Sequence, residues 1–476
     1  MSDREFRFEQ MMSDAEAMMW NIEKDPRLSS SFGTVTIVDR PIDIDVMRKR
    51  IGRAVADIPR MRERVAPVFG RLSPPLWEPD PEFELDYHVR QLALAPPGDE
   101  RQLFELCTRL LQDPLDRTRP LWMFVAIDGL PDGRGALFTK LHHTITDGEG
   151  GVRLAEMYMD VERDPPPPPA VDLDEVLHDA ERERVREPGD SMASSLGNTI
   201  GHGLRRGIGI ARRTAGEAAL AFTDPARLLE GTGNLIAGAA SARDQLSDGG
   251  PGSPVWTERS RHRWFDVLDV PFTAAKEAAV NLGGSLNDFF VTGAAVGAVR
   301  YHDAVGAEAD HFNATFVMST RTDGSAGGNA FTPSKVRLPA SKMDVKERLT
   351  AVQQAMTSRR SEARGANLMG AVSGLANLLP TSFVTGIARS QAASVDFATS
   401  NVRAAPFELY IAGAKVLAPY PMGPVAGTAW NITMLSYAGA LYMGVHVDPA
   451  AVEQPDLLMR CLRDGFREVL EAGGTA

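Results

Sequence analysis

One stretch constrains this chain more than any other: an apolar strand that leads into two adjacent histidines and then an Asp-Gly turn. Ala136 to Leu141 is apolar and partly β-branched with turn residues before it, which predicts a strand. His142 and His143 follow directly, and Asp147-Gly148 lies shortly after them. Because neighbouring side chains on a strand point to opposite faces, one imidazole is expected to face a reaction site and the other to face away. Asp147 can anchor the following loop, while Gly148 allows a tight turn.

This combination favours a catalytic role for the histidine pair over a purely structural one. A neutral imidazole at a strand end can accept a proton from an alcohol, amine or thiol near pH 7. The alternative is a buried histidine pair in a core hairpin, and an arbitrary His-His pair would favour it. The chain has only 9 histidines, and here the full spacing H-H-x-x-x-D-G follows a predicted strand, so motif and context agree.

The motif resembles the signature of coenzyme A-dependent acyltransferases and of the condensation domains of nonribosomal peptide synthetases. The segment from Pro114 to Trp122, P-L-D-R-T-R-P-L-W, resembles a second hallmark of the bacterial wax ester synthase/diacylglycerol acyltransferase family. Further similarity lies at 86–90, at Asn287-Asp288 and at 431–448. The resemblance implies an α/β fold: two α+β two-layer sandwich domains similar to chloramphenicol acetyltransferase, with an active-site tunnel between them.

The resemblance also implies roles for the site residues. His143 would accept the proton of the acceptor hydroxyl, and Asp147 would position the histidine loop by pairing with an arginine. Candidate donors to the oxyanion are backbone amides near Gly148, His142, or the loop at Asn287. Ser285 and Asp288 also form a capping-box pattern, so Asp288 has a structural explanation as well as a supporting role beside Asn287. We found no serine or cysteine elbow motif, so we expect direct transfer without an acyl-enzyme.

The expected partners follow from this chemistry. Acyl-CoA is the donor substrate, so we expect no separate cofactor and no metal. The acceptor is expected to be diacylglycerol, giving triacylglycerol, or a fatty alcohol, giving a wax ester; the sequence does not choose between them. Two other hypotheses stay open: a condensation-type enzyme with a carrier-protein donor, and a weakly active paralogue that binds acyl lipids. The second is suggested by the turn Arg403–Pro406, where the family usually has Pro-Gly-Pro, and by the absence of Pro-Leu before Asp14.

Composition limits the cellular setting. A net charge of −12 argues against nucleic acid as a partner. The 2 cysteines form neither a metal pattern nor a disulfide framework, which fits a reducing compartment. We found no signal peptide and no apolar run of spanning length, so we expect a cytoplasmic protein that meets a membrane or lipid-droplet surface peripherally. The arginine-containing segment 191–246 is either a helix on that surface or a helix that packs across the domains.

The length of 476 residues predicts more than one domain. We expect an N-terminal domain over 1–164, a proline-rich linker with a basic helical connector over 165–254, and a C-terminal domain over 255–476. Hydrophobic periodicity and turn residues predict a strand at 32–38 and helices at 43–58, 101–111, 272–281, 285–302 and 455–470. His88 is interpreted as structural, and Asp116, Arg117 and Arg119 as a charged scaffold.

Overall fold

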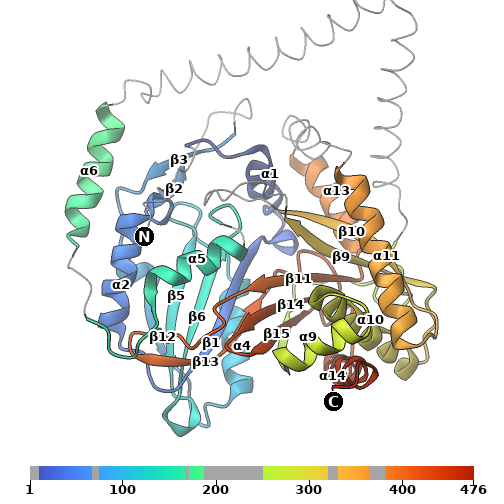
Figure 1. The fold of residues 1–476 in the computed structure, drawn as a ribbon. Helices are drawn as coiled ribbons and strands as arrows, with labels where there is room; N and C mark the ends of the chain where they lie inside the picture. The colour runs from blue at the N-terminus through green and yellow to red at the C-terminus, as the bar shows by residue number, and fades with distance from the viewer. Residues whose placement is uncertain are drawn as a thin grey trace, which may run out of the picture.

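The computed structural model describes seven stretches of the chain: residues 10–66, 74–146, 148–166, 171–186, 250–319, 331–364 and 381–475. Two predictions fall outside them, the role of Asp147 and the nature of segment 191–246. We refer to residues 10–186 as the first half and to 250–475 as the second half. Each half is built on one large β-sheet with helices packed against it (Figure 1).

The sheet of the first half has seven strands in the order β4-β5-β6-β1-β13-β12-β7. These are β1 (Ser31–Val38), β4 (Val89–Ala93), β5 (Trp122–Asp128), β6 (Gly135–His142), β7 (Met159–Asp160), β12 (Tyr410–Ile411) and β13 (Ala414–Met422). Only the pairing of β4 with β5 is parallel. The predicted strand at 32–38 is therefore confirmed as β1, and the strand that carries the histidines ends at His142.

Helices cover both faces of this sheet, because β6 is apolar on both sides. Leu137 and Leu141 face a core that includes residues of α2 and α5, whereas Ala136 and Phe138 face a core that includes residues of α4. The other elements of the first half are α1 (Asp14–Ile22), α2 (Ile44–Asp57), β2 (Glu63–Ala66), β3 (Leu76–Pro79), α3 (Leu85–His88), α4 (Glu100–Gln112), α5 (Gly148–Tyr158) and α6 (Leu173–Arg186), with 3-10 turns at Pro26–Leu28, Pro59–Met61 and Pro131–Gly133. The predicted helices at 43–58 and 101–111 are confirmed as α2 and α4.

The second half has a six-stranded sheet in the order β10-β9-β11-β14-β15-β8. Its elements are β8 (Trp264–Pro271), α9 (Phe272–Asn281), α10 (Leu286–Val305), β9 (His311–Ser319), β10 (Phe331–Pro339), α11 (Val345–Arg364), α13 (Thr381–Ala393), β11 (Phe397–Arg403), β14 (Trp430–Tyr437), β15 (Ala440–Val447) and α14 (Pro455–Ala472). One core joins a face of this sheet to α9, α10, α11 and α14, which lie together in Figure 1. The predicted helices at 272–281, 285–302 and 455–470 are confirmed as α9, α10 and α14.

The second half of the chain contributes two strands to the sheet of the first half. Strands β12 and β13 belong to the second half of the sequence but pair within the first sheet, where β13 lies beside β1. β13 also passes against β15 of the other sheet: a Cβ atom added to Gly444 would lie 1.8 Å from the carbonyl oxygen of Pro421. Glycine at 444 therefore permits this close approach of the two sheets. The domain limits 1–164, 165–254 and 255–476 stay a prediction, to which the structure adds that residues 410–422 complete the first sheet.

A helix that crosses a bilayer must be both long and predominantly apolar. None of the helices in the described stretches meets both conditions. The charged segment after residue 171 forms the helix α6, at the outer side of the first half beside α2 in Figure 1.

Candidate active site

The two histidines lie where β6 leaves the sheet, and the neighbouring strands hold their backbone on both sides. Ser31 of β1 pairs with His142, and the amide of His142 donates to the carbonyl of Leu121 at 3.1 Å. The amide of His143 donates to the carbonyl of Ser30 at 3.2 Å. The apolar strand thus fixes the position of the pair, and the chain turns immediately afterwards.

His142 is committed to two partners inside the protein. Its side chain is buried, with 1% of the residue exposed. The amide of Thr144 donates to Nδ1 at 3.1 Å, and the hydroxyl oxygen of Thr144 lies 2.7 Å from the same nitrogen. An amide can only donate, so Nδ1 is the accepting nitrogen and the proton of the neutral ring is on Nε2. Nε2 then donates to the carboxylate of Glu23.

Glu23 is the site residue that sequence analysis missed. It is the C-cap of α1, and its other carboxylate oxygen accepts hydrogen bonds from Ser29 Oγ at 2.8 Å and from the amide of Ser30 at 3.0 Å. Burial acts to raise the pKa of Glu23, but the hydrogen bond to His142 and the other donors outweigh it, and the net pKa is lowered. The carboxylate is therefore ionised at neutral pH and holds His142 in one tautomer and one orientation.

His143 is the more exposed member of the pair. Its ring lies 4.4 Å from the ring of Phe32 of β1, at an interplanar angle of 33°. Gly151 of α5 brings its backbone close to the same phenyl ring, since a Cβ atom there would lie 3.5 Å from it. Phe32 therefore holds one side of the His143 ring, close to the first turns of α5.

The remaining predicted site residues are distributed differently. Gly148, where a tight turn was expected, is the first residue of α5. Asn287 and Asp288 lie in the first turn of α10, where Ser285 and Asp288 form the predicted capping box. Asn287 Oδ1 meets Asn401 Nδ2 of β11 at 3.5 Å. These contacts belong to the second half, and none of them involves the histidine pair.

His88 and the segment Pro114–Trp122 lie near the end of β6 at His142. Arg117 contacts Trp20 of α1, Asp116 accepts from the amide and hydroxyl of Thr118, and Arg119 lies over the ring of Tyr87. The hydrogen bonds to Thr118 lower the pKa of Asp116.

His88 is completely buried and stacks on Trp122 at 4.4 Å between ring centroids. Its Nδ1 donates to the carbonyl of Trp122 at 2.8 Å, and burial lowers its pKa to about 4. A ring held neutral in this way has the structural role that was predicted for it.

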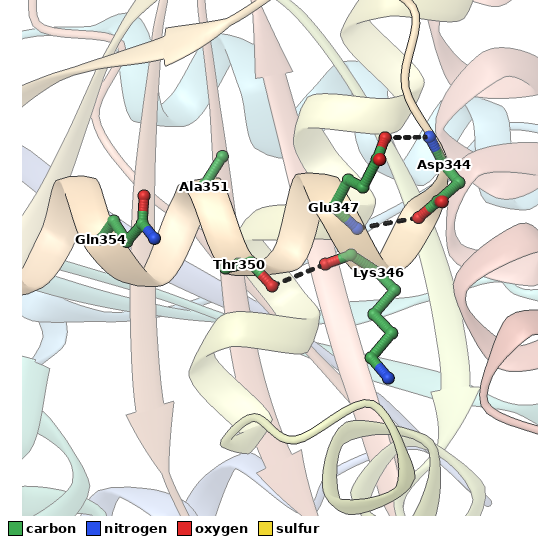
Figure 2. Close-up of a pocket in the computed structure, with 6 residues that line it drawn as sticks. All are labelled: Asp344, Lys346, Glu347, Thr350, Ala351 and Gln354. Carbon is green, nitrogen blue, oxygen red and sulfur yellow. Dashed lines mark hydrogen bonds between the residues drawn. The ribbon is translucent and has the colours of Figure 1, made fainter.

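Within the described residues, neither a metal centre nor the pocket beside α11 adds to the histidine site. In the described parts of the chain, no group of three or more His, Cys, Asp or Glu side chains could hold a metal ion. Figure 2 shows a shallow pocket along the exposed side of α11, lined by Asp344, Lys346, Glu347, Thr350, Ala351 and Gln354. Asp344 and Glu347 bond to each other's backbone amides there, so their charges serve the start of the helix. The pocket contains no histidine.

Comparison with known families gives two matches that together span most of the chain. Residues 12–290 match the wax ester synthase/diacylglycerol acyltransferase catalytic domain, and residues 327–469 match the WS/DGAT C-terminal domain. A Mycobacterium tuberculosis protein provisionally named a diacylglycerol O-acyltransferase is 31% identical over 477 residues, which covers 99% of this chain and 94% of that protein. A second M. tuberculosis protein with the same provisional activity is 27% identical and covers 94% and 92%.

Solved structures agree on the fold. The wax ester synthase/diacylglycerol acyltransferase from Marinobacter aquaeolei VT8 aligns with a TM-score of 0.63 and 19% identity, covering 98% of this chain and 100% of that one. The first condensation domain of the calcium-dependent antibiotic synthetase aligns with a TM-score of 0.59 and 16% identity, covering 98% and 97%. The predicted fold of two α/β sandwich domains is confirmed, while the tunnel between them stays a prediction.

Proposed function

The chain belongs to the wax ester synthase/diacylglycerol acyltransferase family, and we propose that this acyltransferase moves a long-chain acyl group from acyl-CoA to the hydroxyl of a lipid acceptor. Diacylglycerol is the first candidate acceptor, because the Mycobacterium relatives are named diacylglycerol O-acyltransferases. A fatty alcohol is the second, because the family also includes wax ester synthases. Triacylglycerol or a wax ester would be the product.

One observation carries the assignment of the general base. Both ring nitrogens of His142 are engaged inside the protein, with Thr144 and with Glu23. His142 is therefore poorly suited to exchange protons with a substrate, and its neighbour His143, which is more exposed and held at the same strand end, takes that role. A positioned base of this kind contributes roughly 10²–10⁴-fold to the rate.

The proposed reaction has two steps. The acceptor oxygen attacks the thioester carbonyl carbon while its proton moves to His143. The tetrahedral intermediate then expels the thiolate of coenzyme A, which accepts this proton from the His143 imidazolium and leaves as the free thiol. Acyl-CoA is a substrate, so the proposal includes no resident cofactor and no metal, and association with a membrane or lipid-droplet surface supplies the lipid acceptor.

The test is free-thiol release from palmitoyl-CoA with dioleoylglycerol, hexadecanol or no acceptor, with the lipid products separated in parallel. Acceptor-dependent release together with a new ester supports the proposal, and the better acceptor decides between triacylglycerol and wax ester. Folded protein that binds acyl-CoA but shows no acceptor-dependent release would instead support the acyl-lipid-binding paralogue. Release only with an acyl carrier protein as donor would support the condensation-type enzyme.

The matched variants are His143→Ala and His178→Ala, the second being an exposed histidine of α6. We expect His143→Ala to abolish turnover with circular dichroism unchanged, because it removes the proton acceptor but no core contact of β6. His178→Ala should keep the full rate. Retention of more than a tenth of the rate in His143→Ala would remove this residue from the general-base role.

A further inference from the structure

Arg117 contacts the end of the helix that supplies Glu23. Its guanidinium carbon lies 3.3 Å from the ring centroid of Trp20, and its Nη2 donates to the Trp20 carbonyl at 2.6 Å. The rings of Trp20 and His142 meet in a T-shaped arrangement, with 6.3 Å between ring centroids and an interplanar angle of 82°. Trp20 therefore contacts both Arg117 and His142, and it stands three residues before Glu23 in the sequence.

The end of α1 needs a cation for two reasons. The last four carbonyls of a helix have no partner within it, and Trp20 contributes one of them, which Arg117 satisfies. A carboxylate at the C-terminal end of a helix is also unfavourable, because that end carries partial negative charge. Glu23 stands at this position, so the positive charge of Arg117 offsets the repulsion. Burial lowers the pKa of Arg117, and the nearby charge of Glu23 opposes this effect.

We propose that Arg117 is a positioning residue for acyl transfer: it fixes the end of α1 so that Glu23 holds His142, and His142 in turn fixes the turn that carries His143. This inference rests on the function proposed above. It assigns a role to one arginine of the segment Pro114–Trp122, a segment that takes no direct part in the proposed reaction.

The path from Arg117 to the base is short and consists of polar contacts. Displacement of α1 would move the acceptor of the Nε2 proton of His142. The opposite nitrogen of this ring accepts from the amide of Thr144, which lies directly after His143. Rotation of the ring would therefore disturb the backbone on the far side of His143. The expected consequence is a lower kcat with little change in the KM for acyl-CoA.

Arg119 is the matched control, because it makes similar contacts from the same segment. Its guanidinium carbon lies 4.2 Å from the ring centroid of Tyr87, and it donates to the carbonyl of Glu82 at 3.4 Å. Its ion-pair partners Glu84 and Asp116 lie at 3.8 Å. These contacts hold the segment to the α3 region and not to α1.

The experiment compares Arg117→Ala, Arg117→Lys and Arg119→Ala in full-length protein, each with and without Glu23→Gln, and measures kcat, KM and the pH dependence of kcat. Arg117→Ala should lower kcat roughly tenfold with KM within about twofold, as expected for loss of a partly buried cation–π contact. Arg117→Ala should also shift the acidic limb of the pH profile of kcat. In protein that already carries Glu23→Gln, it should lower kcat only slightly further. Arg117→Lys should recover most of the loss, and Arg119→Ala should keep kcat.

Two results would overturn the inference: equal kcat values for Arg117→Ala and Arg119→Ala, or losses that multiply with Glu23→Gln while the pH profile stays fixed. If Arg117→Ala does not fold, Arg117→Gln replaces it, because it keeps a donor for the Trp20 carbonyl and removes the charge. A second readout does not need activity. In protein labelled with ¹⁵N-histidine, the Nε2 proton of His142 should resonate far downfield, move in the Arg117 variants and stay in Arg119→Ala. An unmoved resonance would refute positioning, whereas an inactive parent protein refutes only the proposed function.

Discussion

Glu23→Gln is the most informative single substitution at this site, because it keeps the size of the side chain and removes its charge. The Glu23 carboxylate receives three donors: His142 Nε2, Ser29 Oγ and the amide of Ser30. A Gln amide has one oxygen and one NH₂ group, so whichever way it is turned, its NH₂ group faces either the ring N–H or the Ser30 amide. One buried donor must lose its partner.

The magnitude follows from that count. Loss of one charge-assisted hydrogen bond, with one donor left unsatisfied, is expected to lower the free energy of unfolding by about 2–3 kcal/mol. The folded-state pKa of Glu23 is lowered from the ordinary value of 4.5. The carboxylate therefore stabilises the fold fully above pH 4.5, and this contribution is lost as the pH falls through the lower folded-state pKa. The difference in the free energy of unfolding between the parent protein and Glu23→Gln should therefore disappear at acidic pH.

The assay is urea unfolding followed by tryptophan fluorescence, at neutral pH and in acid, together with kcat for acyl transfer. We expect kcat to fall more than tenfold, because His142 loses its fixed orientation. Glu16→Gln is the control, since Glu16 lies on the same helix and forms the capping box with Ser13, a position where glutamine is also accepted. Unfolding free energies within about 0.5 kcal/mol and an unchanged kcat for Glu23→Gln would refute the reasoning.

Two further predictions concern the contact between the sheets. Gly444→Ala should destabilise the protein by about 3 kcal/mol or more, because its Cβ would lie 1.8 Å from the carbonyl oxygen of Pro421. Thermal melting measures this effect against Gly386→Ala in α13, where an added Cβ would meet nothing within 4 Å, and an unchanged melting temperature for Gly444→Ala would contradict the prediction. His446 is 3% exposed and donates from Nδ1 to the carbonyl of Gly423, and burial lowers its pKa from 6.5 to about 4. The contribution of neutral His446 to the free energy of unfolding should be complete above pH 6.5. It should fall by about 3 kcal/mol towards pH 4, because the histidine binds a proton at higher pH in the unfolded chain than in the folded protein. His446→Gln should flatten the unfolding free energy across this pH range, and an equally steep profile would show that another group titrates.

The elements that were predicted well are those with strong local signals. The helix at 455–470 has a regular apolar face, and the strand before His142 has apolar residues on both sides. The capping box at Ser285 is also a local pattern and is present in the structure. Local patterns therefore located the histidine pair at the end of its strand.

The parts that were missed depend on contacts between distant segments. Glu23 lies 119 residues before His142, and their meeting depends on the pairing of β1 with β6 and on where α1 ends. No periodicity in either segment indicates the other. The placement of β13 beside β1 is similar, because its sequence is compatible with either sheet and tertiary packing decides between them. A carboxylate at a helix C-terminus looks unfavourable until its arginine and histidine partners are known.

The last prediction concerns acceptor choice and the altered turn Arg403–Pro406. Val402 and Ala404 pack, partly buried, against a core that includes Leu154 and Tyr158 of α5, the helix that follows the motif. The amide of Ala404 donates to the carbonyl of Ser436 at 3.0 Å, so the turn is held by β14. The turn contributes Ala404 to this contact, whereas the histidine pair is held by β1, by Leu121 next to β5 and by Glu23 at the end of α1. Substitutions in this turn should therefore change the ratio of triacylglycerol to wax ester more than the pH dependence of kcat.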